Sequence, residues 1–313
     1  MNRIGLCFSK DFLGNQPLSH IGRKLPVYLH FLELCQKKGW EVYVLTRRTY
    51  KGQGVFSGAW RFGQDRFEII PTDVKIDLVY DRSAGVHFPP ENDEGLEVVN
   101  RRDFKILCWD KWLAYQEIGQ FMPATFWVGK KEKIASVLPK IRTEMVVVKP
   151  FNGLKGLSIF IGPKKEVLNF SFDGKFKNYI AQEFIDTSDG IPSLAQGLHD
   201  LRVVIINGKP VWSHIRIPPK GSLKSNAAGG GVLKEIDYQK VPDSIKKIVQ
   251  EVAQKFYQKF DNPIFSLDFG LGKDKKPYIF EINDQIGFPT WEMKKREFFL
   301  EELIINFEEK LKK

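Results

Sequence analysis

Three oxygen-bearing side chains near the carboxyl end of the chain have the types and spacing to bind a divalent cation. Glu281 and Asn283 lie two positions apart in PYIFEIN, residues 277–283, and Asp268 lies upstream in FSLDFG. Because side chains alternate faces along a strand, Glu281 and Asn283 should point the same way, with Asp268 reaching them from a partner strand. Such hard donors suit Mg2+ at nucleotide phosphates better than zinc, which favours sulfur and nitrogen. The alternative is an ordinary hairpin with solvated acids.

Two lysines have the sequence setting to add positive charge beside such phosphates. Lys149 ends the apolar run MVVVKP and is followed by FNGLKG, which contains Gly153 and Gly156. A turn of this kind can lay backbone N–H groups against phosphate oxygens while the lysine supplies charge. Lys111, in WDKW at a predicted helix start, could also point into a cleft. The alternatives are a tight hairpin with a solvated Lys149, and an exposed Lys111.

Two arginines and a flexible loop follow in the last part of the chain. Arg202 comes after His199 and Asp200, and Arg216 ends the next apolar run, beyond an Asn-Gly turn. Two guanidinium groups brought together by that turn would capture a phosphate or a carboxylate, although surface ion pairing is the alternative for either alone. The loop that follows, PPKGSLKSNAAGGG, contains Asn226 and is too polar for a core element. Its plausible use is as a lid over substrate.

The elements needed to position these residues can be read from short apolar runs and helical patterns. Residues 1–110 show strands at 2–7, 41–46, 77–80 and 104–108 and a helix near 22–39, which is typical of a small parallel α/β sheet. From 111 onward two helices precede three strands, namely MVVVKP, LSIFIG and NYIAQEFI. This pattern predicts a small sheet with helices on one face.

The remaining residues predict a second sheet with two long helices. LRVVIING and KPVWSHIRI form a hairpin, a helix runs from about Pro242 to Phe260, and the hairpin with the acidic residues follows. A helix near 292–312 closes the chain. Its apolar stripe predicts core packing and comprises Phe299, Leu303, Ile304, Phe307 and Leu311. The fold class is therefore α/β, with α+β lobes after residue 110, and we expect three domains, at 1–110, 111–186 and 187–313.

Composition excludes several classes of protein. The 313 residues are 42% hydrophobic and 27% charged, which fits a globular chain of two or three lobes and not a disordered one. The net charge of +10 is spread along the chain, so it favours small anions over nucleic acid. The net positive charge is the only feature that would support nucleic-acid binding.

Cysteines and apolar runs bear on where the protein works. Three scattered cysteines predict buried thiols in a reducing cytoplasm, not a disulfide framework or metal cluster. The amino terminus fits a strand better than a signal peptide, and no run reaches the length of a membrane span. The five histidines have no recognisable catalytic partners, so we expect each to be a structural or surface residue. His199, beside Asp200 and near Arg202, is the one whose role stays open.

The order of these segments carries a family resemblance. WDK, VVVKPFNGLKGLSIF, AQEFI, HDLRV, IRIPPKGSLKSNAAGGG and SLDFG followed by FEIN occur in that succession. Together they resemble the ATP-grasp carboxylate-amine ligases, and most of all the bacterial glutathione synthetases and the ribosomal-protein glutamate ligases. The resemblance covers residues 111 to about 291 and implies an ATP-grasp fold with a small parallel α/β lobe at the amino terminus.

The resemblance implies three groups of site residues. Lysines, loop glycines and the backbone after the third strand would hold ATP, with Glu183 or Asp186 near the ribose; the ATP group comprises Lys111, Lys149, Gly153, Gly156, Gln182, Glu183, Phe184, Ile185 and Asp186. The magnesium ligands would be Asp268, Glu281 and Asn283. The catalytic group, which would steady the transferred phosphoryl group and the tetrahedral intermediate, comprises Arg202, Arg216 and Asn226.

The implied activity is ATP-dependent formation of an amide between an amino-acid or peptide carboxylate and an amine, through an acyl phosphate. ATP and Mg2+ are the implied cofactors, with Mn2+ as an alternative ion. The implied partners are these small substrates, without nucleic acid or membrane, and both a monomer and a homo-oligomer stay open. An ATP-binding sensor or scaffold without chemistry is the alternative function. Departures from the synthetases, namely DQIGFPTW after Asn283 and VYDRSAGVHFPP with Arg82 as a candidate contact, leave the carboxylate substrate undetermined.

Overall fold

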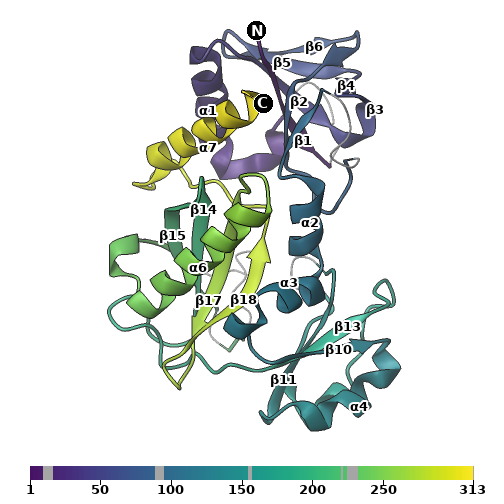
Figure 1. Cartoon of the computed structure of the whole chain (residues 1–313), viewed down its shortest axis with the longest axis vertical. Helices are drawn as coiled ribbons and strands as arrows, with labels where there is room; N and C mark the ends of the chain where they lie inside the picture. The colour runs from purple at the N-terminus through teal and green to yellow at the C-terminus, as the bar shows by residue number, and fades with distance from the viewer. Residues whose placement is uncertain (10–16, 89–94, 154–156, 220, 224–231, 313) are drawn as a thin grey trace.

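The computed structural model describes the whole chain except residues 10–16, 89–94, 154–156, 220, 224–231 and 313. Its main sheets form three lobes, numbered in sequence order, and in Figure 1 the third lobe lies between the first and the second along the long axis of the molecule. A six-stranded sheet lies in the first lobe, a four-stranded sheet in the second and a five-stranded sheet in the third. This arrangement confirms the predicted α/β fold class.

The first sheet has the order β6-β5-β2-β1-β8-β9. Its strands are β1 (Arg3–Phe8), β2 (Glu41–Thr46), β5 (Ala59–Gly63), β6 (Arg66–Ile70), β8 (Leu78–Asp81) and β9 (Glu97–Val99). Strands β2, β1 and β8 are parallel as predicted. The sequence did not indicate β9, which pairs in parallel with β8, or β5 and β6, which form an antiparallel hairpin at the edge. A small separate sheet comprises β3 (Tyr50–Gly52), β4 (Val55–Phe56) and β7 (Val74–Lys75).

The predicted strand at 104–108 is wrong, because this segment lies within helix α2 (Arg102–Trp109). Phe104, Leu107 and Cys108 are buried together, and Ile106 is exposed. Burial at positions i, i+3 and i+4 is the helical period, which a five-residue apolar run does not distinguish from a buried strand. Helix α3 (Lys111–Ile118) follows directly, and the Asp110 carboxylate caps it by accepting from the backbone nitrogens of Trp112 and Leu113.

The second sheet is antiparallel, with the order β10-β13-β11-β12. Its strands are β10 (Thr125–Gly129), β11 (Met145–Pro150), β12 (Phe160–Pro163) and β13 (Tyr179–Glu183), and the short helices α4 (Ile134–Val137) and α5 (Lys164–Val167) accompany it. Val146 and Val148 pack with residues of both helices in one apolar cluster. The alternate residues Val147 and Lys149 must therefore point to the opposite face.

The third sheet is also antiparallel, with the order β16-β15-β14-β17-β18. Its strands are β14 (Asp200–Ile206), β15 (Lys209–Ile217), β16 (Val232–Ile236), β17 (Phe265–Leu271) and β18 (Pro277–Asn283). Helix α6 (Asp243–Lys259) covers one face (Figure 1), and its buried Ile245, Val249, Val252 and Phe256 form a helical stripe against that face. The predicted Asn207-Gly208 turn is confirmed, since both residues have positive φ angles.

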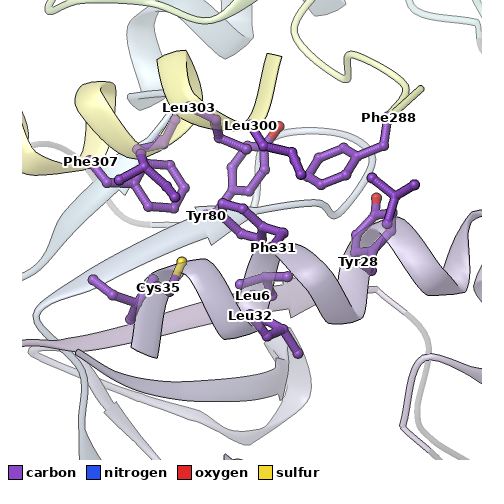
Figure 2. Packing of buried hydrophobic residues seen from close by; sticks show 14 of the residues in the cluster. Leu6, Tyr28, Phe31, Leu32, Cys35, Tyr80, Phe288, Leu300, Leu303 and Phe307 are labelled. Carbon is purple, nitrogen blue, oxygen red and sulfur yellow. The ribbon is translucent and has the colours of Figure 1, made fainter. Parts of the chain in front are cut away.

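The last helix, α7 (Arg296–Leu311), leaves the third sheet and lies beside α1 (Leu25–Lys37) of the first lobe, as Figures 1 and 2 show. Phe299, Leu303 and Phe307 are fully buried in a cluster with Leu6, Phe31 and other residues of the first sheet. Each such side chain stabilises the fold by about 1.5–3 kcal/mol. The predicted core role of this stripe is confirmed, while the predicted domain boundaries remain a prediction.

Two further observations concern cysteines and membranes. Cys7, Cys35 and Cys108 are buried free thiols, as the sequence predicted, and burial raises the pKa of each. None of the helices in the described part of the chain combines the length and the apolar character needed to cross a membrane.

Candidate active site

Strand β14 places a charged row on one face of the third sheet. Leu201, Val203 and Ile205 pack with the helix α6 side, so Arg202 points to the opposite face. The ladder register sets Arg202 opposite Asp268 on β17 and opposite His214 on β15, and it sets Asp268 opposite Glu281 on β18. Directly opposed residues share a face, so this row brings the two predicted metal-binding carboxylates together.

A β-bulge in β18 adds an aromatic ring to the same face. Asp268 pairs with Glu281 but the next residue, Phe269, pairs with Ile279, so Phe280 is the extra residue. Ile279 and Ile282 stay in the core, whereas Phe280, Glu281 and Asn283 line a cavity. A Cβ atom at Gly270 would lie 2.3 Å from Cζ of the Phe280 ring, so glycine is what leaves room for that ring.

Asp268 is the centre of a buried network of ion pairs. Its Oδ1 accepts from Arg202 Nε at 2.6 Å, and its Oδ2 accepts from Arg202 Nη2 at 2.6 Å and from Arg216 Nη2 at 2.7 Å. Arg216 also pairs with Asp200 of β14. Burial alone would raise the pKa of Asp268, but the two guanidinium groups outweigh it and hold that pKa well below its usual range.

The arginines therefore lie where a phosphoryl group could be held, but not in the predicted way. Arg216 stands opposite Asp200, and Arg202 opposite His214, so the two guanidinium groups meet at Asp268 and not directly across the hairpin. Although burial would lower the pKa of Arg216, the Asp268 and Asp200 carboxylates raise it above its ordinary value. Arg216 thus stays charged in the physiological range, and both guanidinium groups lie in a low-dielectric site where charge acts strongly.

Two lysines lie on the other side, Lys149 on β11 of the second sheet and Lys111 at the start of helix α3. Lys149 Nζ donates to Gln182 Oε1 at 3.1 Å and lies 3.4 Å from the Phe280 carbonyl oxygen. Lys111 Nζ donates to the Gly153 carbonyl at 2.8 Å and lies 3.3 Å from Glu281 Oε1. Burial, reinforced by Lys111 and opposed by Glu281, lowers the pKa of Lys149 to about 8. The alternatives of a solvated Lys149 and an exposed Lys111 are therefore wrong.

A cavity of about 350 Å³ separates these two faces, a size typical of small-molecule sites. Its charged part is lined by Lys111, Lys149, Arg202, Arg216, Asp268 and Glu281, with Asn283 beside them. Its apolar part is lined by Val147, Ile159, Ile161, Phe184, Ile185, Leu198 and Phe280. The lining thus combines apolar side chains, which suit a flat ring, with charged side chains, which suit an anion with a metal ion.

The predicted adenine segment also borders the cavity. Gln182, Glu183, Phe184 and Ile185 are all lining residues, together with Gly153. The Glu183 carboxylate accepts from the Arg142 backbone nitrogen at 3.0 Å. Asp186 does not line the cavity, and its carboxylate instead pairs with Lys273 at 2.7 Å. Of the two alternatives for the ribose contact, the geometry favours Glu183.

Two predicted site residues lie outside the described part of the chain. These are Gly156 of the FNGLKG turn and Asn226 of the proposed lid. Their roles as an ATP contact and a catalytic residue remain predictions.

The three predicted metal ligands fit a magnesium ion by donor type. Asp268, Glu281 and Asn283 offer two carboxylates and an amide oxygen on one sheet face, all hard donors. Asn283 Nδ2 donates to Asp268 Oδ2 at 3.2 Å, which leaves the amide oxygen facing away from that bond. No cluster of three His, Cys, Asp or Glu suited to a metal occurs among the described residues.

His199 and the Nη2 end of Arg82 make structural contacts. His199 Nε2 accepts from the Leu271 backbone nitrogen at 3.1 Å, and its Nδ1 lies 3.0 Å from the Gly197 carbonyl. Burial lowers the pKa of His199, which favours the neutral ring that these two contacts need. Arg82 Nη2 donates to the Ile286 carbonyl at 2.7 Å, so it braces the loop after β18. It does not line the cavity.

Phe280 and Asp200 are two of the lining residues that sequence reasoning missed. Phe280 enters the cavity only because of the bulge, which no local pattern in PYIFEIN indicates. Asp200 was noted as a neighbour of His199 but was given no role, although it is the second carboxylate of Arg216. Its position at the start of a strand, two residues before Arg202, was the available signal.

Comparisons with known proteins agree with this geometry. The profile of the RimK-like ATP-grasp domain matches residues 103–304. A glutathione synthetase of Prochlorococcus marinus is 26% identical over 72% of this chain and 76% of its own length. Human N-acetylaspartylglutamate synthase A is 28% identical over 44% of this chain but only 35% of its own length. A D-alanyl-alanine synthetase A structure from Vibrio cholerae superposes with a TM-score of 0.66 at 14% identity, covering 100% of this chain and 99% of that one.

Proposed function

This chain belongs to the RimK-like ATP-grasp family and is an ATP-grasp ligase, and we propose that it joins an amino-acid or peptide carboxylate to an amine through an acyl phosphate. The observation that carries the proposal is the convergence of two sheet faces on one cavity. Lys149 lines it from the second sheet, Lys111 lines it from the start of helix α3, and Arg202, Asp268 and Glu281 line it from the third sheet. The alternative of an ATP-binding scaffold without chemistry would not require the buried arginine pair.

The apolar part of the cavity would hold the adenine ring between the two sheets. Ile185 lies two residues beyond the end of β13, and its backbone takes no hydrogen bond from the described residues. Its N–H and C=O groups are therefore available to a ring edge, whereas the backbone nitrogens of Glu183 and Phe184 already donate to Ala124 and Thr143. The triphosphate would then extend toward the lysines.

In the proposed reaction a substrate carboxylate oxygen attacks the γ-phosphorus of ATP, and the bond from that phosphorus to the bridging oxygen of ADP breaks. Arg202 and Arg216 lie in the cavity at the place where negative charge would crowd, and fixed guanidinium groups lower the barrier there. The amine nitrogen then attacks the acyl carbon, inorganic phosphate leaves, and the nitrogen releases a proton. The oxygen ligands Asp268, Glu281 and Asn283 would hold Mg2+, which offsets phosphate charge when bound.

The reaction needs no side-chain nucleophile. This fits the described residues that line the cavity, among which there is no Ser-His or Cys-His pair and His199 has both ring nitrogens engaged by backbone. It also fits the buried, high-pKa thiols, which lie in apolar clusters.

The test is a screen for ADP release with Mg-ATP, a panel of amino-acid and peptide carboxylates, and a panel of amines, followed by mass spectrometry of the product. We expect ADP release to depend on one carboxylate and the product mass to equal the sum of both substrates minus water. Tight ATP binding without ADP release for every pair would contradict the ligase proposal and would favour the scaffold. We place this reaction in the cytoplasm, where ATP is available.

A further inference from the structure

Lys24 carries an ammonium group whose surroundings are positively charged. It ends the 3-10 helix η1 (Ser19–Lys24) and directly precedes helix α1. Arg82, Arg23 and Arg202 are the charges that act on it, and no carboxylate of the described residues pairs with it. Burial first, and these cations second, lower its pKa to about 8. A cation held among cations is unfavourable, so a structural role in the ligand-free protein does not account for its position.

The packing around Lys24 leaves its ammonium group room at the boundary between two lobes. A Cβ atom on Gly287 would lie 3.1 Å from Lys24 Nζ, so this glycine of the loop after β18 leaves space for the amine. The neighbouring Phe288 stacks on Tyr28 of helix α1 at 4.2 Å, and Figure 2 shows these two rings together. The loop that follows the metal-binding strand thus lies against the lobe that carries Lys24.

Two further polar groups near Lys24 are buried and unsatisfied. His214 is 4% exposed and its Nδ1 has no hydrogen-bond partner among the described residues. Burial, together with Arg202, Arg216 and Lys24, holds the pKa of His214 well below its ordinary value, so its ring is neutral. Nε of Arg82 is likewise buried without a partner in the described part of the chain. Buried polar groups are nearly always satisfied, so these groups point to a missing partner.

Arg202 connects this cluster to the cavity. It lines the cavity and stands directly opposite His214 in the sheet. Its positive charge repels that of Lys24 and lowers the pKa of Lys24. An anion beside Lys24 would therefore be close to the reacting carboxylate, yet separate from the triphosphate that faces Lys111 and Lys149. A substrate with two carboxylates could place one at the reacting position in the cavity and the other beside Lys24.

We propose that Lys24, with His214 and Arg82, forms a subsite for a second carboxylate of a substrate, one that does not react. The ligand class is a dicarboxylic acid or amino diacid as acyl donor, or an amino acid as amine acceptor. The proposal rests on the proposed ligase function. It makes Lys24 a specificity-determining residue, and it gives the amino-terminal lobe a direct part in choosing the substrate.

The test uses hydroxylamine as an uncharged amine, which traps an acyl phosphate as a hydroxamate. The full protein is assayed with Mg-ATP, hydroxylamine and pairs of acids that differ in one carboxylate, such as glutarate with glutaramate and succinate with succinamate. Lys24→Met removes the charge while keeping the chain length. Lys37→Met, at an exposed position near the end of helix α1, is the matched control.

If the subsite serves the acyl donor, the diacid should exceed its monoamide in kcat/KM by about 10- to 100-fold, the worth of one charged hydrogen bond. Lys24→Met should remove this preference and leave the rate with the monoamide unchanged, and Lys37→Met should keep the preference. If the subsite serves the acceptor, Lys24→Met should leave the hydroxamate assay unchanged and weaken only the reaction with amino-acid amines.

Three other outcomes separate a failure of the subsite, a failure of the ligase function and misfolding of the variant. If Lys24→Met changes neither the comparison of diacid with monoamide nor the reaction with amino-acid amines, the subsite is overturned while the ligase function stands. Absence of hydroxamate and of ADP release with every acid counts against the proposed function itself. A misfolded Lys24→Met protein is detected by its melting temperature, and Lys24→Gln then provides the uncharged variant; we expect neither to be less stable than wild type without substrate.

Discussion

The two walls of the cavity differ in how their charges are compensated. On the third sheet Asp268 holds Arg202 and Arg216 in a buried network, and Asp200 adds a second partner to Arg216. On the second sheet Lys149 has only neutral oxygen partners, and its pKa is lowered to about 8. The charges of Arg202 and Arg216 are therefore compensated without ligand, whereas the charge of Lys149 is under-compensated.

This difference suggests a division of work between the lobes. The lysines would provide the driving force for binding an anion, because a phosphate supplies the negative charge that Lys149 lacks. The arginine network would instead be a preorganised surface whose donors need little reordering, which is the property that matters most when charge develops in a reaction. Binding should thus depend mainly on one wall and turnover on the other.

The largest effect is expected from Asp268→Asn, which breaks the compensated wall. Loss of the central carboxylate removes one proposed metal ligand and leaves two buried guanidinium groups without their shared partner. We expect ADP release to fall by about 10²–10³-fold and the free energy of unfolding to fall by about 3–5 kcal/mol. ADP release and urea denaturation measure the two effects; a variant with more than a tenth of wild-type turnover would contradict this assignment.

The under-compensated wall is tested next by Lys149→Met. Removal of the buried ammonium should weaken ATP binding by about 10- to 100-fold, as expected for a charged hydrogen bond. Turnover at saturating ATP should change less than it does in Asp268→Asn. Calorimetric titration with a non-hydrolysable ATP analogue gives the affinity. Equal losses of affinity in the two variants would show that the walls do not divide binding and turnover.

The lowered pKa of Lys149 predicts a pH dependence with a definite sign. Only the protonated amine attracts phosphate, and bound phosphate must raise its pKa, so ATP affinity should fall as the pH rises above about 8. Between pH 7 and pH 9 we expect about a tenfold loss in EDTA, which removes any metal at Glu281. Lys149→Arg stays charged over this range and is the matched control, which should show little change. An unchanged affinity in wild type would contradict the prediction.

A smaller effect is expected where the walls meet the adenine ring. Gly270→Ala would place Cβ 2.3 Å from the Phe280 ring and 2.7 Å from Thr187 Cγ2, so the ring must move. Such crowding costs about 1–3 kcal/mol, and we expect the KM for ATP to rise several-fold with little change in kcat. Steady-state kinetics at varied ATP separates the two constants. A lowered kcat with an unchanged KM would place Phe280 away from the nucleotide.

The smallest effect should distinguish two acids at the proposed ribose end. Asp186 forms a partly exposed pair with Lys273 and does not line the cavity, so Asp186→Ala should change stability by about 0–1 kcal/mol and the KM for ATP by less than about twofold. Glu183→Ala should raise that KM several-fold, because Glu183 is a lining residue. The reverse order would assign the ribose contact to Asp186.

The sequence predicted best what depends on strand alternation and order. Glu281 and Asn283 share a face with Asp268 because the period of a strand is two, and the Asn-Gly turn specified its hairpin. The segment at 104–108 was misread because a five-residue apolar run fits both a strand and a helix. A run of this length carries no information on which one forms.

What could not be predicted depends on contacts between distant segments. The bulge that turns Phe280 into the cavity arises from pairing with β17, and the pairing of Arg216 with Asp200 arises from the register of β14 and β15. The position of Lys24 depends on packing between the first lobe and the loop after β18. Neither local propensity nor spacing encodes such contacts.

The central claim is that both walls meet a single metal-bound triphosphate, and an experimental crystal structure with Mn2+ and a non-hydrolysable ATP analogue tests it most directly. The anomalous signal of Mn2+ should lie within bonding distance of oxygens of Asp268 and Glu281. Lys149 should contact the phosphates of the same nucleotide. A nucleotide or an ion bound away from these residues would contradict the account.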